Sequence, residues 1–385
     1  MSNLLKILIF FSIASTTLFA KTDGWIEGKI SSMSIEEKVG QMLMLSLNGS
    51  YLDTKLTHKI DQVFAGSIIL FESNIQHEDQ VTTFLHNLQI RSLMRSGIPL
   101  IVAVDQEGGL VNRIGKVIDP VRSQYSPRTL GRAYILHKTR TQKALRSFYR
   151  SLATRMRQWG INMNLAPVLD ISHDPSSPLF SRSFSSNPKT VSAMALNMSL
   201  AMQSSGIIVT GKHFPNLGST KIDSHKTLPI LRRTLTEMSR HELYPYFRLK
   251  NDLDVIMLGH ILVPDIDPVL PVSISQKASN YIRKKIGFDG IIMTDDLKMG
   301  ALSKNFSIDY IIRSILKTDT DIILLASQSE LHEKSFKIIL ESIRSKETPI
   351  RRINDSVRRI LQLKRRYLFD NPPTNHFNND YDWIP

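Results

Sequence analysis

The sequence predicts an α/β fold in which eight parallel strands and their crossover helices form a single (β/α)8, or TIM-like, barrel. Short runs rich in Ile, Val, Leu and Met recur with helix-length intervals between them, as expected for parallel strands that are buried on both faces. A closed barrel requires eight such runs. The eight runs span residues 41–45, 66–71, 99–105, 162–167, 207–214, 254–260, 290–295 and 321–326.

Polar residues at the ends of four runs support the same fold. Asp105 follows IVAV, Lys212 and His213 follow IIVTG, His260 follows VIMLG, and Asp295 follows IIMT. In a barrel of this kind, the C-terminal ends of the strands form the face that carries the active site. Any one of these residues could be an ordinary strand-end cap, but four such coincidences predict a shared site.

The composition agrees with one large domain. Of the 385 residues, 42% are hydrophobic and 22% are charged, which provides enough apolar material for a sizeable core. Ser34 stands three residues before Glu37, a capping-box pattern that predicts a helix ahead of the first strand. We expect a barrel domain over residues 21–370 and a polar C-terminal tail over residues 371–385, with no internal repeat or second domain.

The N-terminus has the pattern of a secretory signal peptide. Lys6 precedes an apolar run over residues 7–13, and small residues then lead to a cleavage point after Ala20. The run is shorter than the roughly 20 residues that a membrane-spanning helix needs. We therefore expect removal of residues 1–20, no stable membrane insertion of the mature chain, and a periplasmic or secreted location. An N-terminal membrane anchor is the alternative.

Charge and missing residue types exclude several functions. The chain has no cysteine, so it has no disulfide, thiolate ligand or cysteine nucleophile. Its formal net charge of +14 raises the question of nucleic-acid binding. Much of this charge falls within residues 138–157 and 351–366, where apolar residues recur at helical spacing, so solvated helix faces explain it. We expect no nucleic-acid partner, although an anionic wall polymer would be attracted.

Common catalytic patterns do not fit. GIIVTGKH, residues 206–213, approaches the spacing of a P-loop, but His213 stands where Ser or Thr is required, and the interior residues form an apolar strand. The sequence contains no HExxH helix and no GxSxG elbow. His173 and Asp174 are too few to nominate a metal site. We therefore expect neither a metal ion nor a cofactor.

The longest loop contains a candidate proton-transfer pair. The segment GKHFPNLGSTKIDSHKTLP, residues 211–229, continues past a buried strand, and loops of this length are usually functional. Asp223 stands two residues before His225, so its carboxylate can orient one imidazole nitrogen and leave the other to transfer protons. A surface turn stabilised by Asp223 is the alternative.

Further acids and an arginine complete the candidates. Asp295 can serve as a nucleophile while Asp296 caps the next helix; the alternative is that both cap the helix. In VDQEGG, Asp105 and Glu107 precede paired glycines that permit a tight turn and the close approach of a ligand. Arg182 offers a donor fork for a carboxylate or for sugar hydroxyls, or else forms a structural salt bridge.

In this order, VDQEGG, NLAPVLD, RSF, KHFP, DSH and TDDLKM resemble glycoside hydrolase family 3, specifically its β-N-acetylhexosaminidases of the NagZ type. The resemblance extends from about residue 32 to residue 366. It implies a retaining exo-β-N-acetylglucosaminidase that acts through a covalent glycosyl-enzyme. We expect the chain to be a monomer. The implied substrate carries terminal β-linked N-acetylglucosamine, as in peptidoglycan fragments, muropeptides or related oligosaccharides.

The resemblance also implies residue roles. Asp295 is similar to the catalytic nucleophile of the family, and His225 to its general acid and base, with Asp223 as the orienting partner. A His–Asp dyad next to an anionic nucleophile avoids placing two bare carboxylates close together. The residues that resemble those holding the N-acetylglucosamine unit are Asp105, Arg113, Arg182, Lys212 and His213.

The chain departs from the family pattern in the loop that carries the dyad. Where the family usually has KHFPGHGDT, this chain has KHFPNLGST, so Asn216, Leu217 and Ser219 are substitutions, and Leu110 replaces a frequent Arg. Two alternatives therefore stay open. One is a β-glucosidase or β-xylosidase of the same family, and the other is a catalytically weak peptidoglycan-binding protein. The signal-like N-terminus is a further departure, because Gram-negative relatives usually act in the cytoplasm.

Overall fold

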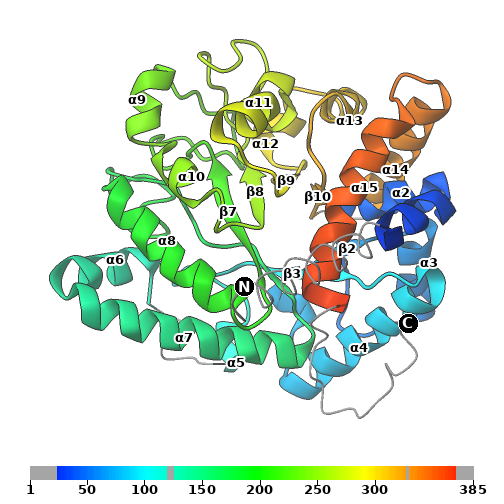
Figure 1. The fold of residues 1–385 in the computed structure, drawn as a ribbon, viewed down its shortest axis with the longest axis horizontal. Helices are drawn as coiled ribbons and strands as arrows, with labels where there is room; N and C mark the ends of the chain where they lie inside the picture. Colours follow the sequence, from blue (N-terminus) through cyan, green and yellow to red (C-terminus); the bar gives the residue numbers. More distant parts are fainter. Residues whose placement is uncertain (1–23, 119–124, 327–328, 370–385) are drawn as a thin grey trace, which may run out of the picture.

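Eight parallel strands form one nearly closed barrel in the computed structural model, which describes residues 24–118, 125–326 and 329–369 (Figure 1). The expected signal peptide and the tail over residues 371–385 lie outside the described residues. The strands are β1 (Leu43–Ser46), β2 (Ser67–Leu70), β3 (Ile101–Val104), β6 (Met163–Asn164), β7 (Ile208–Phe214), β8 (Val255–Leu258), β9 (Ile291–Thr294) and β10 (Ile323–Leu325). Each overlaps one of the eight predicted runs, so the predicted barrel is confirmed.

The strand order shows how the barrel closes. The sheet runs β10-β1-β2-β3-β6-β7-β8-β9, and all neighbours in it are parallel. A parallel bridge between Met293 and Ile322 then connects β9 to the start of β10. The C-terminal ends of all eight strands therefore point to the same face, on which the polar residues predicted from the sequence should meet.

Helices cover the outside of the barrel, as Figure 1 shows. They are α2 (Ile35–Gln41), α3 (Thr54–Gln62), α4 (Glu78–Ser96), α5 (Gly115–Ile118), α6 (Pro127–Leu136), α7 (Lys138–Trp159), α8 (Pro188–Gln203), α9 (Leu235–Arg240), α10 (Tyr244–Leu249), α11 (Gln276–Tyr281), α12 (Gly300–Ser303), α13 (Ile308–Leu316), α14 (Ser329–Arg344) and α15 (Ile350–Lys364). Short helical turns are η1 (Glu72–Asn74), η3 (Val272–Ile274), η4 (Ile282–Ile286) and η5 (Arg365–Phe369). The capping box of Ser34 and Glu37 is present at the start of α2, as predicted.

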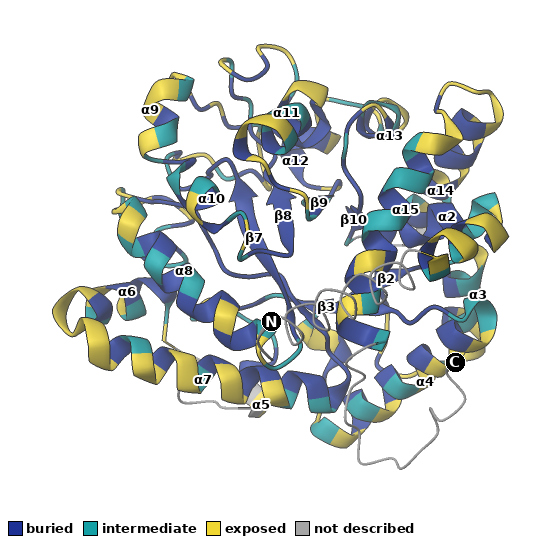
Figure 2. Ribbon diagram, in the orientation of Figure 1, coloured by how far each residue is buried: buried dark blue, intermediate teal, exposed yellow. Residues whose placement is uncertain are grey.

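The barrel strands are buried on both faces (Figure 2). Strands β2, β3, β7, β8 and β9 are buried at every position. Successive side chains point to opposite faces of a strand, so the barrel interior and the helix layer must both be apolar. This explains why the strands read as continuous apolar runs rather than as alternating patterns. Within the described ranges, no helix has the length and apolar character needed to cross a bilayer.

The buried carboxylate of Asp321 connects several elements at the edge where the barrel closes. Asp321 immediately precedes the Ile322 bridge and is fully buried. Its Oδ2 accepts hydrogen bonds from Arg283 Nη2 of η4 at 2.9 Å and from the Ile292 amide of β9 at 3.0 Å. Its Oδ1 accepts from Ser356 Oγ at 2.6 Å and from Arg359 Nη2 at 2.8 Å, both of α15. One side chain thus connects β9, η4 and α15 at the closing edge.

We expect Asp321→Ala to lower the free energy of unfolding by about 3 to 5 kcal/mol, because removing one member of a buried ion pair leaves the other charge uncompensated. Urea denaturation measures this value. Asp309→Ala is the matched control, since Asp309 is half exposed and pairs with Arg313 within one helix. It should cost less than about 1 kcal/mol. Similar losses of unfolding free energy in the two variants would show that the buried Asp321 does not stabilise the closing edge of the barrel.

Candidate active site

One cavity of about 320 Å³ brings together the catalytic and ligand-binding residues that the family resemblance implied, although not His260. Its lining comes from the ends of β3, β7 and β9 and from the loops that follow the strands. The predicted residues that line it are Asp105, Arg113, Arg182, Lys212, His213, Asp223, His225 and Asp295. The structure therefore brings these residues together at the C-terminal ends of the barrel strands.

The two glycines after Glu107 form the turn expected of them. Residues 106–112 fold into a small antiparallel hairpin of β4 (Gln106–Gly108) and β5 (Val111–Asn112). Gly108 and Gly109 have φ angles of 93° and 64°, which favour glycine. A Cβ atom on Gly109 would also lie 2.9 Å from the Ser126 Cα. The hairpin turns Glu107 and Arg113 toward the cavity, whereas Leu110 is exposed and does not line it.

A buried group of paired charges forms the floor on this side. Lys212 Nζ lies 2.6 Å from Asp105 Oδ1 and 2.6 Å from Glu107 Oε1. Arg182 donates two parallel hydrogen bonds to Glu107, of 2.8 Å from Nε and 2.7 Å from Nη2. The salt bridge that the sequence left open for Arg182 is thus present. Glu107 was noted in the sequence but not assigned to the site, and it holds both cations in place.

The pKa values of this group follow from the pairing. Burial alone would raise the pKa of Glu107, but Arg182 and Lys212 hold it well below its ordinary value. Burial alone would lower the pKa of Lys212, but Asp105 and Glu107 raise it above its ordinary value. The carboxylate and both cations are therefore charged at neutral pH. Asp105, with 18% of its side chain exposed, is the member most accessible to a ligand hydroxyl.

Asp295 follows β9 and faces the cavity as an ionised carboxylate. Burial would raise its pKa, but the His213 and His260 rings lower it, assisted by a hydrogen bond from the Asp296 amide to Oδ1 of 2.8 Å. His213 Nε2 lies 4.0 Å from Asp295 Oδ2. Asp296 turns away, and its Oδ1 accepts from the Lys298 and Ala326 amides. The prediction that Asp296 caps the next helix is wrong, because the N-cap of α12 is Met299 and no side chain bonds there. Asp296 instead connects the end of β9 to the segment after β10.

Two buried residues that sequence reasoning left without a role support this carboxylate. Asp170 Oδ2 lies 2.6 Å from His213 Nδ1, which leaves Nε2 directed at Asp295. His260 was expected among the residues of the shared site, but it is fully buried and does not line the cavity. Its Nε2 lies 2.9 Å from the Asp296 carbonyl oxygen and its Nδ1 lies 2.8 Å from Ser273 Oγ. In the sequence, the NLAPVLD motif, which ends at Asp170, was the signal that could have identified Asp170 as a site residue.

The Asp223–His225 pair stands at the rim of the cavity. His225 Nδ1 lies 2.9 Å from Asp223 Oδ1, which also accepts the His225 amide at 2.9 Å. The hydrogen bonds from His225 lower the pKa of Asp223 despite its partial burial. The imidazole has 67% of its side chain exposed, so Nε2 is open to a ligand or to water. The pair has the orientation expected of a proton-transfer dyad, and the loop turn proposed as the alternative coexists with it.

The dyad loop rests on the helix that follows Asp295. The Gly300 amide donates to the His225 carbonyl, and the Ala301 amide donates to the Ser224 carbonyl, both at 3.0 Å. A Cβ atom on Gly300 would lie 2.7 Å from the His225 oxygen and 2.8 Å from the Lys226 oxygen. Only glycine allows this close approach, which couples the position of the dyad to the segment that carries Asp295.

The substituted positions of the loop form its internal frame. Asn216 Oδ1 accepts the Ile171 amide at 2.7 Å, and its Nδ2 donates to Ser219 Oγ at 2.6 Å. Ser219 in turn donates to the buried Glu242 at 2.9 Å. Leu217 is buried and lines the cavity. The substituted residues therefore connect the loop to the Ile171 backbone and to Glu242, and Leu217 forms part of the cavity wall.

Arg113 is the predicted ligand-binding residue that carries a buried donor left unpaired within the described part of the chain. Its guanidinium carbon lies 5.9 Å from the centre of the Phe71 ring. Its buried Nε has no hydrogen-bond partner among the residues that the structure describes. A buried unpaired donor is costly, so an arriving ligand oxygen would stabilise it. Across these same described residues, no group of three or more His, Asp or Glu side chains could hold a metal ion.

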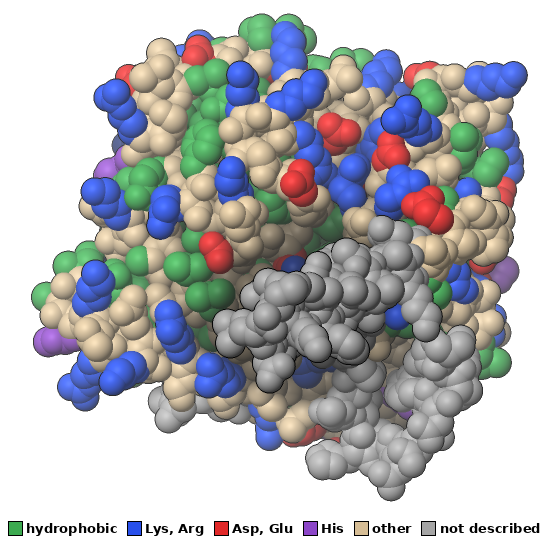
Figure 3. Space-filling model, in the orientation of Figure 1, with side chains coloured by type: hydrophobic (Ala, Val, Ile, Leu, Met, Phe, Trp, Pro, Cys, Tyr) green, Lys and Arg blue, Asp and Glu red, His purple; other side chains and the backbone are tan. Residues whose placement is uncertain are grey.

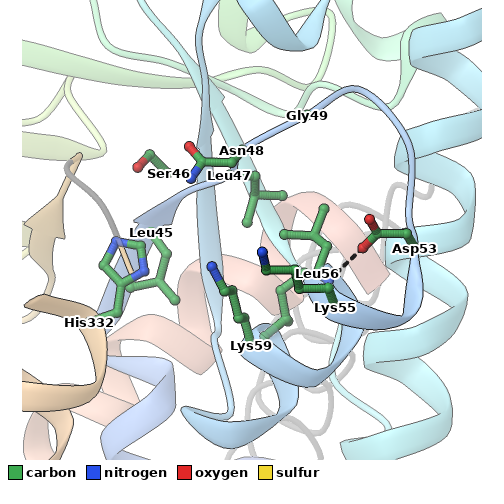
Figure 4. A pocket seen from close by; sticks show the side chains of 11 residues that line it. Leu45, Ser46, Leu47, Asn48, Gly49, Asp53, Lys55, Leu56, Lys59 and His332 are labelled. Carbon is green, nitrogen blue, oxygen red and sulfur yellow. Dashed lines mark hydrogen bonds between the residues drawn. The ribbon is translucent and has the colours of Figure 1, made fainter. Parts of the chain in front are cut away.

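A second cavity, of about 330 Å³, lies beside β1 and α3 (Figure 4). Lys55 and Lys59 extend into it from α3, and His332 of α14 faces them. Asp53, the one carboxylate in its lining, is already the N-cap of α3, with Oδ1 2.7 Å from the Leu56 amide. This cavity contains none of the predicted site residues and no pair of acidic groups, so the barrel cavity is the candidate active site.

Comparison with known proteins gives a consistent result. Residues 34–363 match the profile of the glycosyl hydrolase family 3 N terminal domain. The β-hexosaminidase of Thiobacillus denitrificans is 30% identical over 294 residues, which cover 76% of this chain and 80% of that protein. The β-hexosaminidase of Pseudomonas aeruginosa is 32% identical, covering 67% and 74% of the two chains.

Solved structures are similar over most of the chain. A family 3 β-N-acetylglucosaminidase from Paenibacillus superimposes with a TM-score of 0.82 at 29% identity, covering 88% of this chain and 64% of that one. The chain therefore spans slightly less than two thirds of the Paenibacillus protein. M. tuberculosis LpqI superimposes with a TM-score of 0.76 at 27% identity, covering 87% and 94% of the two chains.

We expect Gly300→Ala to displace the dyad loop and to lower kcat/KM by about 10- to 100-fold, since a shift of about 1 Å in a reacting group has effects of this size. Steady-state kinetics on an aryl glycoside with a poor leaving group measures it. Gly28→Ala is the control, because a Cβ atom there meets no other atom within 4 Å. Full activity of the Gly300 variant would show that the contact with α12 does not position the dyad.

Proposed function

The chain belongs to glycosyl hydrolase family 3 and is a glycoside hydrolase, and on that basis we propose that it is a retaining exo-β-N-acetylglucosaminidase. One observation carries the proposal: an ionised carboxylate, Asp295, and an oriented imidazole, His225, share one cavity. The curated relatives bear the name β-hexosaminidase, which supports an N-acetylated amino sugar as the terminal unit.

The two steps of the reaction use these groups in turn. Asp295 attacks the anomeric carbon of the terminal sugar, the glycosidic C–O bond breaks, and His225 gives its proton to the departing oxygen. His225 then removes a proton from water, which attacks the anomeric carbon and releases the Asp295 carboxylate. Each step inverts the anomeric carbon, so the overall configuration is retained. Asp223 holds the Nδ1 side of the ring, which directs proton transfer through Nε2.

The size and polarity of the cavity suit one terminal sugar. Its volume of about 320 Å³ is at the lower end of the range of about 300 to 1,000 Å³ for small-molecule sites. Asp105 and Lys212 on its floor offer an acceptor and a donor for ring hydroxyls, and Arg113 offers an unpaired donor. A pocket of this size with the dyad at its rim favours cleavage at a chain end over cleavage within a long polymer.

We further propose that the natural substrates are peptidoglycan fragments or related oligosaccharides outside the cytoplasm. The support is the signal-like pattern of residues 1–20, which would export the chain to the compartment that contains the cell wall. We also propose that the chain acts as a monomer, which is supported by the meeting of Asp223, His225 and Asp295 of one chain in a single cavity.

The proposal is tested by comparing an aryl β-N-acetylglucosaminide with the matching aryl β-glucoside. We expect hydrolysis of the N-acetyl substrate alone, and loss of more than about 10³-fold in kcat on Asp295→Ala, since the nucleophile is removed. Circular dichroism shows whether the variant is folded. Faster hydrolysis of the glucoside would favour the β-glucosidase or β-xylosidase alternative. No hydrolysis of either by folded protein, with binding to peptidoglycan retained, would favour the wall-binding alternative.

The role of His225 has its own test. We expect His225→Ala to impair hydrolysis strongly for aryl glycosides with poor leaving groups and weakly for those with good ones, because a good leaving group needs little protonation. The measurement is kcat/KM across a series of phenols of increasing pKa. The slope of log kcat/KM against phenol pKa should become steeper in the variant. Equal losses across the series would count against the proton-donor role.

A further inference from the structure

The surface formed by α6 and α7 concentrates the positive charge of the chain. Between residues 121 and 169 there are ten Lys or Arg residues and no Asp or Glu. Seven of the ten belong to α7, which contains no acidic residue. The two helices pack side by side on the outside of the barrel (Figure 1). Intrahelical pairs of opposite charge, which usually balance a solvated helix, are therefore impossible on α7.

Several cations of this surface are exposed. Arg132, Lys138, Arg140, Lys143 and Arg150 are all exposed, and within the described part of the chain none of them forms an ion pair. Figure 3 shows a row of Lys and Arg side chains along the lower left of this view, where α7 lies in Figure 1, with no acidic side chain among them. Among the residues that the structure describes, no acidic side chain therefore offsets the charge repulsion along this row.

Exposed apolar side chains adjoin the row of cations. Ile135 and Leu136, at the corner between α6 and α7, are 62% and 74% exposed, and Tyr125 is 53% exposed. A cavity of about 540 Å³ between the two helices is lined mainly by apolar groups, including Leu130 and Phe148, with Arg140 in its lining. Exposed apolar groups beside a polybasic row are typical of surfaces that bind at a membrane interface.

We propose that the face made by α6 and α7 binds the surface of an anionic lipid bilayer. The cations match the negative headgroups, and the Ile135–Leu136 corner lies where it can enter the interfacial layer beside them. A soluble polyanion or a nucleic acid would satisfy the cations but would leave these aliphatic side chains in water. Burial of apolar area, which only the lipid provides, is favourable in proportion to the area removed from water.

The same face is attached to the wall of the active-site cavity. Arg128 of α6 donates to the Ser172 carbonyl at 2.6 Å and to the Phe180 carbonyl at 3.1 Å. A Cβ atom on Gly131 would lie 1.8 Å from the Phe184 oxygen, so α6 lies directly against the loop that carries Arg182. Binding of this face to a bilayer would therefore hold the barrel mouth close to the membrane surface, where lipid-proximal glycans lie.

The test is co-sedimentation of the chain from Lys21 onward with vesicles of phosphatidylcholine alone or with added phosphatidylglycerol. We expect binding to the anionic vesicles only, weakened by salt. Because each basic residue near an anionic surface contributes roughly fivefold to partitioning, Lys143→Gln combined with Arg150→Gln should weaken binding about 25-fold. Lys284→Gln combined with Lys285→Gln is the matched control, with the same change in net charge at exposed positions of η4, and should bind as the parent does.

The apolar corner separates lipid from other anionic partners. Ile135→Ser combined with Leu136→Ser should weaken vesicle binding while leaving binding to soluble polyglutamate unchanged, and Val269→Ser, at another exposed apolar site, should change neither. Equal binding to neutral and anionic vesicles would overturn the proposal. Vesicle binding that ignores the Ile135 and Leu136 changes would also overturn it, and would assign the face to soluble anionic polymers instead.

Discussion

The floor of the cavity depends on a balance of buried charge. Lys212 is almost completely buried, and a lone ammonium in that position would lose its proton or destabilise the fold. Asp105 and Glu107 prevent both outcomes, and Arg182 supplies the second cation that allows Glu107 to stay ionised without any exposure. These four side chains come from three different loops or strands, so each fixes the position of the others. A sugar hydroxyl therefore meets donors and acceptors that are already oriented, which lowers the ordering cost of binding.

The dyad contrasts with this rigid floor. Asp295 is surrounded by buried partners, whereas His225 is largely exposed and is held through backbone hydrogen bonds to α12. The difference suits the chemistry, because the nucleophile must stay ionised and fixed, while the proton donor must exchange protons with water in the second step. The frame of Asn216, Ser219 and Glu242 anchors the other end of the loop in the protein interior. Local substitutions can thus alter loop stiffness without displacing Asp295.

Much of the fold was predictable because its signals are local. A strand buried on both faces requires a continuous apolar run, and eight such runs were visible without any structure. The position of Asp295 followed from the same logic, since a polar residue directly after such a strand must lie at the barrel mouth. The roles of Glu107 and Asp170 could not be read in this way. Their importance comes from partners 75 and 43 residues away. NLAPVLD marks the position of Asp170, but no local pattern reveals which residue it contacts.

His260 shows the limit of arguments from strand ends. It follows β8 as Asp295 follows β9, yet its ring lies behind Asp295 and bonds to Ser273 and the Asp296 carbonyl. The reason is the bend of the chain after β8, where the Gly259 amide bonds to the Phe214 carbonyl and the next residue turns into the core. A strand end fixes the face of the barrel that a residue approaches, but the following backbone decides whether its side chain enters the cavity or packs beneath it.

The distribution of charge also bears on the substrate. The cavity lining holds four carboxylates, on Asp105, Glu107, Asp223 and Asp295, and three cations, on Arg113, Arg182 and Lys212. A pocket without excess positive charge does not concentrate anions, so the group bound next to Asp295 should be neutral, as an N-acetylated sugar is. The net charge of +14 resides elsewhere, with a large share on α6 and α7. The net positive charge of the chain therefore determines what its outer surface attracts. The chemistry of the cavity depends instead on the paired charges that line the cavity.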